Sequence, residues 1–170
     1  MNLLSHRRIA VVAVIVAAAL LVTAGAAVAT TWIVKGRTVK AVAVASADNL
    51  VSTYSGTWSD VPNMSIGVSV ASSTHALFLI TFAAENKCGA CTGYVRVLLN
   101  EAVVVPVENP TNGVIFATAS ELQSNSMQWV ASPIPAGQYT IKVQYRQSSG
   151  GIGTSFNLGP RTLSVVKSVI

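Results

Sequence analysis

The chain has 170 residues, of which 51% are hydrophobic and only 10% are charged, against roughly 25% charge in average soluble domains. This composition excludes a disordered chain, which would combine low hydrophobicity with high charge. The net charge of +5 arises before residue 41, because the rest of the chain carries six basic and six acidic side chains. The body of the chain therefore lacks the clustered basic patch that nucleic-acid binding requires, and we expect no nucleic-acid partner.

The N-terminal part of the chain is a run of 26 uncharged residues, Ile9 to Val34, with two arginines before it and a lysine after it. A bilayer-spanning helix needs about 20 such residues. Residues 1–34 are therefore predicted to be a membrane anchor that contacts the bilayer through residues 9–34, or a signal peptide cleaved after Ala27-Val28-Ala29. The length of the run favours the anchor, because the apolar core of a signal peptide is shorter. In either case we expect the following domain outside the cell, on the membrane or secreted.

A short connection and a β-rich domain are predicted next. Residues 35–51 mix small and polar side chains without a helical stripe, which indicates a linker before a domain over residues 52–170. In Met64–Val70 and in Gly137–Arg146, apolar and polar residues alternate with period two, which is typical of half-buried strands. Ala76–Ala83 is apolar on both faces, which suits a central strand covered on both sides.

Short strands and turns account for the rest of the predicted domain. Further strands are predicted at Tyr94–Leu99, Ala102–Val107, Val114–Thr118, Met127–Ala131 and Thr162–Lys167. Asn100-Glu101 is expected to form a two-residue hairpin turn, and Ala119–Gln128 is the only candidate for a short helix. About eight strands at regular spacing predict an all-β fold, an antiparallel β-sandwich behind the N-terminal transmembrane or signal helix.

Four stretches carry a resemblance to other proteins. They are TFAAE (81–85), GYVRVLLNEAVVVP (93–106), PIPAGQYTIKVQYRQSSGG (133–151) and PRTLSVV (160–166). This arrangement resembles uncharacterised exported bacterial and phage β-sandwich proteins of a jelly-roll-like kind, over roughly residues 64–166. The resemblance implies a module at a cell or virion surface. Its motifs are strand and turn patterns, and it implies no active site.

Cys88-Gly89-Ala90-Cys91 is the one motif that suggests chemistry. A structural disulfide is favoured, because exported proteins form and keep such bonds. One alternative is a redox-active pair, which needs an acidic thiol such as one at a helix N-terminus. The other is half of a zinc site, which needs four ligands and hence a dimer. We expect Gly89 to relieve backbone strain in the tight loop.

Other candidate residues are few. His75 is the only histidine after the N-terminal segment, and no Gly-x-Ser-x-Gly motif accompanies it. The six acids show no local pairing, although a glycosidase pair can form between residues distant in sequence. We therefore expect no catalytic, metal-ligating or cofactor-binding residue and no cofactor. Tyr54, Trp58, Tyr94 and Tyr145 are candidates for a glycan-binding platform, although edge packing is the commoner role of such side chains.

These observations predict a non-catalytic extracytoplasmic surface module for binding or assembly, with a protein or glycan ligand or with copies of itself. The alternative is a thiol–disulfide exchange protein that uses Cys88 and Cys91. A third hypothesis, a hydrolase with a dispersed site, predicts a pocket that holds two of the acids together with His75.

Overall fold

The computed structural model describes residues 39–72, 74–104, 113–148 and 153–169. The predicted membrane segment over residues 9–34 lies outside them. Among the described residues, none belongs to a helix with the length and hydrophobicity that crossing a bilayer requires.

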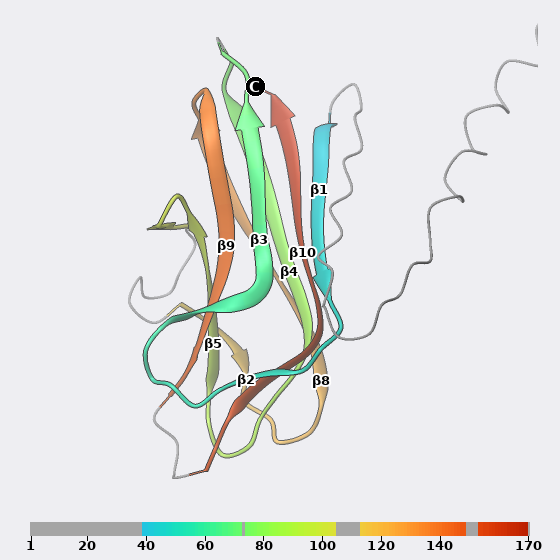
Figure 1. Ribbon diagram of the computed structural model, residues 1–170, viewed down its shortest axis with the longest axis vertical. Coiled ribbons are helices and arrows are strands. Elements are labelled where there is room, and N and C mark those ends of the chain that lie inside the picture. Colours follow the sequence, from blue (N-terminus) through green and yellow to red (C-terminus); the bar gives the residue numbers. More distant parts are fainter. Residues whose placement is uncertain (1–38, 73, 105–112, 149–152, 170) are drawn as a thin grey trace, which may run out of the picture.

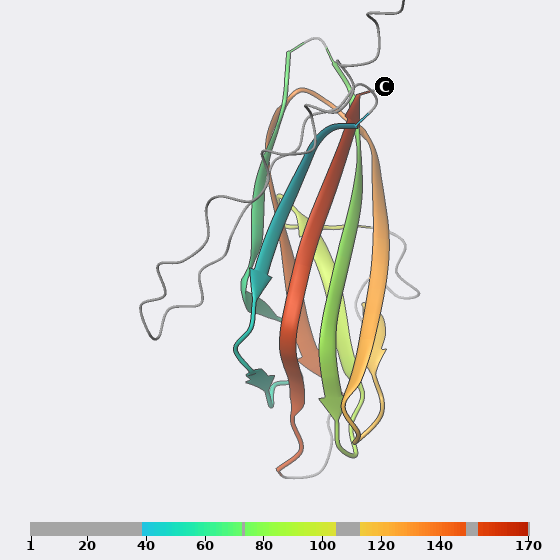
Figure 2. The same cartoon turned by 90° about the vertical axis from the view of Figure 1, so that its right-hand side faces the viewer.

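The described residues form ten strands in two antiparallel sheets that pack face to face (Figures 1 and 2). Sheet A contains β1 (Val39–Ala47), β2 (Val51–Thr53), β4 (Ala76–Cys88), β8 (Gln123–Ile134) and β10 (Phe156–Val169). Its order is β1-β10-β4-β8, with β2 paired to β10. Sheet B contains β3 (Ser59–Val70), β5 (Gly93–Leu99), β6 (Ala102–Val103), β7 (Val114–Ala117) and β9 (Gly137–Gln147). Its order is β3-β9-β5-β6, with β7 paired to β5.

The core lies between the sheets and follows the predicted alternation. Every second residue from Met64 to Val70 is buried, and on β9 the buried Ile141 and Val143 alternate with the outward-facing Lys142. Aromatic rings join the sheets across the core, for example Phe82 of β4 and Phe116 of β7, with ring centroids 5.3 Å apart. Burial of these apolar faces is the main free-energy gain of folding.

One local prediction is confirmed in part and another in full. β4 is a central strand between β10 and β8, as its apolar sequence indicates, but it is not covered on both sides, because its outward side chains Leu77 and Leu79 are only half-buried. Asn100 and Glu101 form the tight turn between β5 and β6, with φ of 46° and 68°. Two consecutive residues with positive φ are characteristic of the type I′ turn, whose twist matches that of paired strands.

The prediction of a linker over residues 35–51 is wrong for most of that segment. Val39–Ala47 forms β1, which pairs with β10 from Val39–Ser168 to Ala47–Arg161, and β2 begins at Val51. The domain therefore includes residues well before position 52. Alanine has a low preference for strands, but its small side chain fits here because alternate residues of β1 face the core.

The short helix predicted over Ala119–Gln128 is also wrong. β8 begins at Gln123 and pairs with β4, with Trp129 opposite Ile80 and Asn125 opposite Ala84. The polar residues in this strand lie at the sheet edge, where they contact solvent, so they do not oppose an extended conformation.

Candidate functional site

Strands β5 and β9 are neighbours in sheet B (Figure 1). Aromatic and basic side chains gather on the outer face of these two strands. Tyr94 and Arg96 project from β5, and Tyr94 is the register partner of Arg146 on β9. The guanidinium carbon of Arg96 lies 4.4 Å from the centroid of the Trp58 ring. That of Arg146 lies 5.0 Å from the Trp58 ring and 4.9 Å from the Tyr94 ring. We name these four residues the arginine–aromatic surface.

The Trp58 ring has room at this position because the residue against it, just before β7, is a glycine. Trp58 immediately precedes β3, whereas Gly113 immediately precedes β7. A Cβ atom on Gly113 would lie 2.5 Å from Cη2 of Trp58, and Gly113 has a φ of +68°. Only glycine accepts both the close contact and this backbone conformation without strain. Sequence order alone does not show this contact, since the two residues lie far apart along the chain.

A chain of polar contacts extends the arginine–aromatic surface along the sheet. Arg96 donates from Nε and Nη2 to Gln144 Oε1, at 2.9 and 2.6 Å, and Gln144 Nε2 donates to Asp60 Oδ1 at 2.6 Å. Lys142 Nζ contacts Asp60 Oδ2 at 3.2 Å and Glu101 Oε1 at 2.9 Å. The side chains that surround the aromatic rings are therefore held in place by one another.

Contacts between charged and polar side chains on this face shift the pKa values of Asp60, Arg96 and Lys142. The hydrogen bond from Gln144 lowers the pKa of Asp60 against the effect of burial, and Lys142 lowers it further. Burial lowers the pKa of Arg96, and the nearby charge of Arg146 adds to that shift. Hydrogen bonds to its two carboxylate partners raise the pKa of Lys142. At neutral pH these groups are therefore charged hydrogen-bonding partners.

A groove of about 630 Å³ continues from the polar chain where β3 leaves β9. The register moves from Asp60–Gln144 to Ser65–Lys142, so several residues of β3 bulge away from the neighbouring strand. Pro62 lies in this bulge and has no N–H to donate to a sheet ladder. The groove is lined by the bulge, by the Asn100-Glu101 turn and by two residues of β9. Asp60 and Lys142 belong to both features, so the groove and the polar chain form one continuous surface.

Of the four aromatic residues proposed as a platform, the structure brings two together. Trp58 and Tyr94 meet around Arg146, whereas Tyr145 is only 6% exposed and packs against Phe156 in the core. Tyr54 is 69% exposed. Sequence reasoning placed Arg146 on the outward side of its strand but missed the two arginines as partners of the rings. Only the register of β5 and β9 reveals them.

The structure joins Cys88 and Cys91 in a disulfide, with Cα atoms 5.2 Å apart. Cys88 is the fully buried last residue of β4, and its N–H donates to the carbonyl oxygen of Ala119 at 2.7 Å. The residue with positive φ in this loop is Ala90, at 53°, and not Gly89 as expected. The buried position at a strand end differs from the helix N-terminus that activates catalytic cysteines.

Among the described residues, none of the grooves at Asp60, Asp48 and Phe116 brings His75 together with two of the acids. His75 is exposed just before β4 and lines none of these three grooves. Asp48 and Glu85 do line one groove, of about 370 Å³, together with Arg161. Among the described residues, no group of three or more histidine, cysteine, aspartate or glutamate side chains is arranged to hold a metal ion.

Arg161 beside that groove is a buried residue that sequence reasoning missed. It is only 3% exposed, and burial lowers its pKa. Its guanidinium donates to the carbonyl oxygens of Asn49 and Gly159 and, at 3.1 Å, to that of Pro62. These bonds connect β10 to the β1–β2 connection and to β3. These hydrogen bonds explain why the charged side chain of Arg161 can be buried without a ligand.

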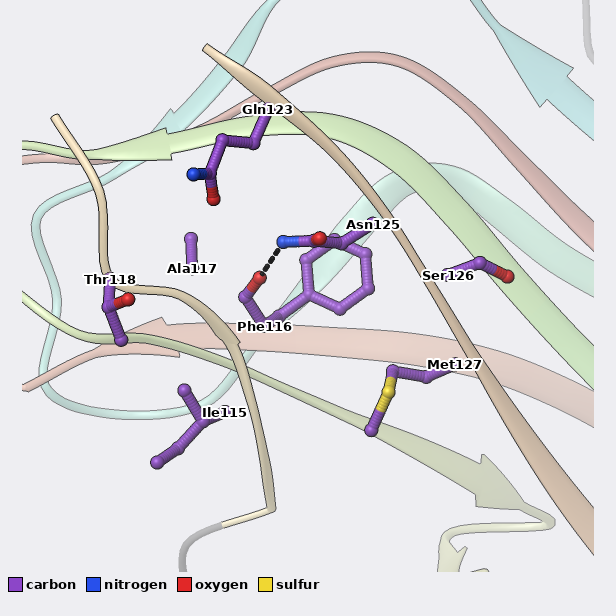
Figure 3. A pocket seen from close by; sticks show the side chains of 8 residues that line it. All are labelled: Ile115, Phe116, Ala117, Thr118, Gln123, Asn125, Ser126 and Met127. Atoms are coloured by element: carbon purple, nitrogen blue, oxygen red, sulfur yellow. Dashed lines mark hydrogen bonds between the residues drawn. The ribbon is translucent and has the colours of Figure 1, made fainter. Parts of the chain in front are cut away.

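A smaller groove, of about 270 Å³, separates β7 from β8 (Figure 3). Asn125 of β8 reaches across it, and its Nδ2 donates to the carbonyl oxygen of Phe116 at 2.6 Å. The residues around it are neutral, including Ile115, Gln123 and Met127.

Comparison with protein-family models and with curated proteins finds no match to the chain, so function must be argued from these surfaces.

Proposed function

We propose that the protein is a non-catalytic extracytoplasmic surface module that binds a glycan through the arginine–aromatic surface. In this proposal the two sheets form a jelly-roll-like β-sandwich, and residues 9–34 deliver it to the outside as an anchor or a signal peptide. The observation that carries the proposal is the stack of Trp58 with Arg96 and Arg146 beside the groove of about 630 Å³.

The chemistry of this surface suits a sugar. A pyranose ring has an apolar face of C–H groups and a rim of hydroxyl groups. Trp58 is half-buried, and its ring together with the planar guanidinium groups of Arg96 and Arg146 that lie over it offers flat surfaces that match the apolar face. Charged side chains such as Arg96 and Asp60 are the hydrogen-bonding partners that hydroxyl groups need, and charge-assisted hydrogen bonds are stronger than neutral ones.

The geometry gives less support to thiol–disulfide exchange. A catalytic pair presents an accessible, acidic first thiol. Cys88, the first cysteine of the pair, is fully buried at the end of β4. A structural role of the disulfide is the interpretation that agrees with this burial.

The proposal can be tested with the full-length protein in detergent micelles and an array of neutral, acidic and amino-sugar polysaccharides. Trp58→Ala removes the ring against which the sugar would pack, and Arg96→Ala removes a charged hydrogen-bond donor. Each should weaken binding about tenfold, because a hydrogen bond to a charged group contributes about 1.5–3 kcal/mol and 1.4 kcal/mol corresponds to a tenfold change. Ser69→Ala, at an exposed position of the same sheet outside the groove, is the matched control. Thermal unfolding verifies that each variant is folded. Absence of binding to every glycan, or binding that survives Trp58→Ala, would refute the proposal.

A further inference from the structure

β8 forms one edge of sheet A (Figure 2). It has 12 residues, and its paired neighbour among the described strands is β4. An edge strand presents every second N–H and C=O group away from its own sheet, which is a template for pairing with another strand. A long edge of this kind needs either protection or a partner.

The edge of sheet B formed by β3 is protected, whereas β8 is not. β3 contains Asp60 and Pro62, and its register with β9 is broken between Asp60 and Ser65. Charge, proline and bulges are the devices that keep edge strands from pairing. β8 has no charged residue, its proline lies near its end at position 133, and its register with β4 is regular from Gln123 to Ala131.

Sheet B does not cover this edge through backbone pairing in the described residues. At the groove between β7 and β8, the Asn125 side chain donates a hydrogen bond to the carbonyl oxygen of Phe116 (Figure 3). The side chain of Asn125 thus satisfies a β7 carbonyl that a further strand would otherwise use. The backbone edge of β8 continues beyond this point, through Gln128 and Val130.

We propose that β8 pairs antiparallel with β8 of a second copy of this chain, so that two copies of sheet A form one continuous sheet. A two-fold axis brings the same stretch of both copies together. Any charge near the axis would therefore face a like charge, which destabilises a strand pair. No side chain in the exposed outward row of β8 is charged; this row runs from Ser126 through Gln128 to Val130. This neutrality favours a second copy over a charged foreign strand.

This inference is independent of glycan binding. It uses the edge of sheet A, whereas the arginine–aromatic surface lies on the outer face of sheet B. Either proposal can therefore fail while the other stands, and one set of variants can measure both.

Cysteine cross-linking provides the first test, because both native cysteines are already joined. Ser126→Cys, Gln128→Cys and Val130→Cys are made singly in the full-length chain and oxidised in micelles, alone and in pairwise mixtures. Residues opposite each other in such a pair lie about 4.5–5.5 Å apart, within the range for a disulfide. At least one single variant or mixture should give a disulfide-linked dimer. Ser69→Cys, exposed on β3, is the control and should give no disulfide-linked dimer.

Sedimentation of the uncross-linked protein provides the second test. The unmodified chain should be dimeric, and Gln128→Lys should reduce dimer affinity at least tenfold, whereas Ser69→Lys should not. The inference would be overturned if the unmodified chain were monomeric, or if Gln128→Lys left the dimer affinity unchanged. It would also be overturned if Ser69→Cys cross-linked as efficiently as the cysteine variants of β8. Glycan binding by the monomeric Gln128→Lys variant shows whether the proposed function holds independently.

Discussion

Replacing Gly93 by alanine tests how closely the two sheets approach at the start of β5. A Cβ atom at this position would lie 2.5, 2.6 and 2.7 Å from Cδ2, Cγ and Cε2 of the Phe156 ring on β10. The ring cannot move toward solvent, because Phe156 is fully buried and packs against Tyr145. Overpacking of a core costs about 1–3 kcal/mol. Since three ring atoms are involved, we expect about 3 kcal/mol for Gly93→Ala.

The matched control is Gly67→Ala. Gly67 is also a strand residue, on β3, but it is exposed, and a Cβ there would have no atom within 4 Å. Alanine restricts the unfolded chain more than glycine does, so this change should stabilise the protein by about 0.4–1 kcal/mol. Urea unfolding of the full-length chain measures both variants. If Gly93→Ala destabilises the protein no more than Gly67→Ala does, the argument from close packing is refuted.

A second substitution separates the clash from other effects. Phe156→Leu removes ring atoms that face Gly93 and should cost stability by itself, because Phe156 is fully buried. Combined with Gly93→Ala it should cost clearly less than the sum of the two, because residues in contact couple by about 0.5–3 kcal/mol. Additive effects would show that the alanine acts elsewhere.

Ile141→Ala should cost about 2–5 kcal/mol in urea unfolding, because the residue is fully buried, whereas Lys142→Ala at the adjacent outward position should cost a small fraction of that. Equal costs would contradict the assignment of faces. The variant with Cys88→Ala and Cys91→Ala should still fold, since a loop this short contributes about 2 kcal/mol, and the unmodified protein should show no free thiol on titration. Two free thiols would reject the disulfide. Because the pKa of Asp60 is lowered from its ordinary value of 3.8, its contribution is present above that pH and is lost as pH falls through the lower value of the folded state. Asp60→Asn should therefore flatten the dependence of Tm on pH below about pH 4, and an unchanged acid limb would reject this role.

The sequence by itself predicted those strands whose alternation is regular. In Met64–Val70 and Gly137–Arg146 the outward residues are polar or glycine and alternate with apolar inward ones, so a local pattern was sufficient. The Asn100-Glu101 turn was also predictable, because tight hairpins are set by two residues and their flanking strands. The membrane segment over residues 9–34 stays a prediction from hydrophobicity alone.

The tertiary structure decided the segments with weak local patterns. Val39–Ala47 looked like a linker because it is rich in alanine, but pairing with β10 makes it a strand. Gln123–Ile134 is polar enough to suggest a helix or loop at its start, but β4 supplies the hydrogen bonds that make it an edge strand. Strand preferences are weak compared with such pairing.

The arginine–aromatic surface was also decided by the tertiary structure. The sequence showed that Tyr94 and Arg146 belong to strands, but nothing local states that β5 and β9 are neighbours or that these two residues are opposite each other. The contact of Trp58 with both arginines depends in addition on Gly113, whose missing side chain leaves room for the ring. Alternation is a property of one strand, whereas sheet order and register depend on contacts between strands far apart in the chain. That difference is the reason that the sequence alone predicts the faces of individual strands, and only the folded protein assembles them into a site.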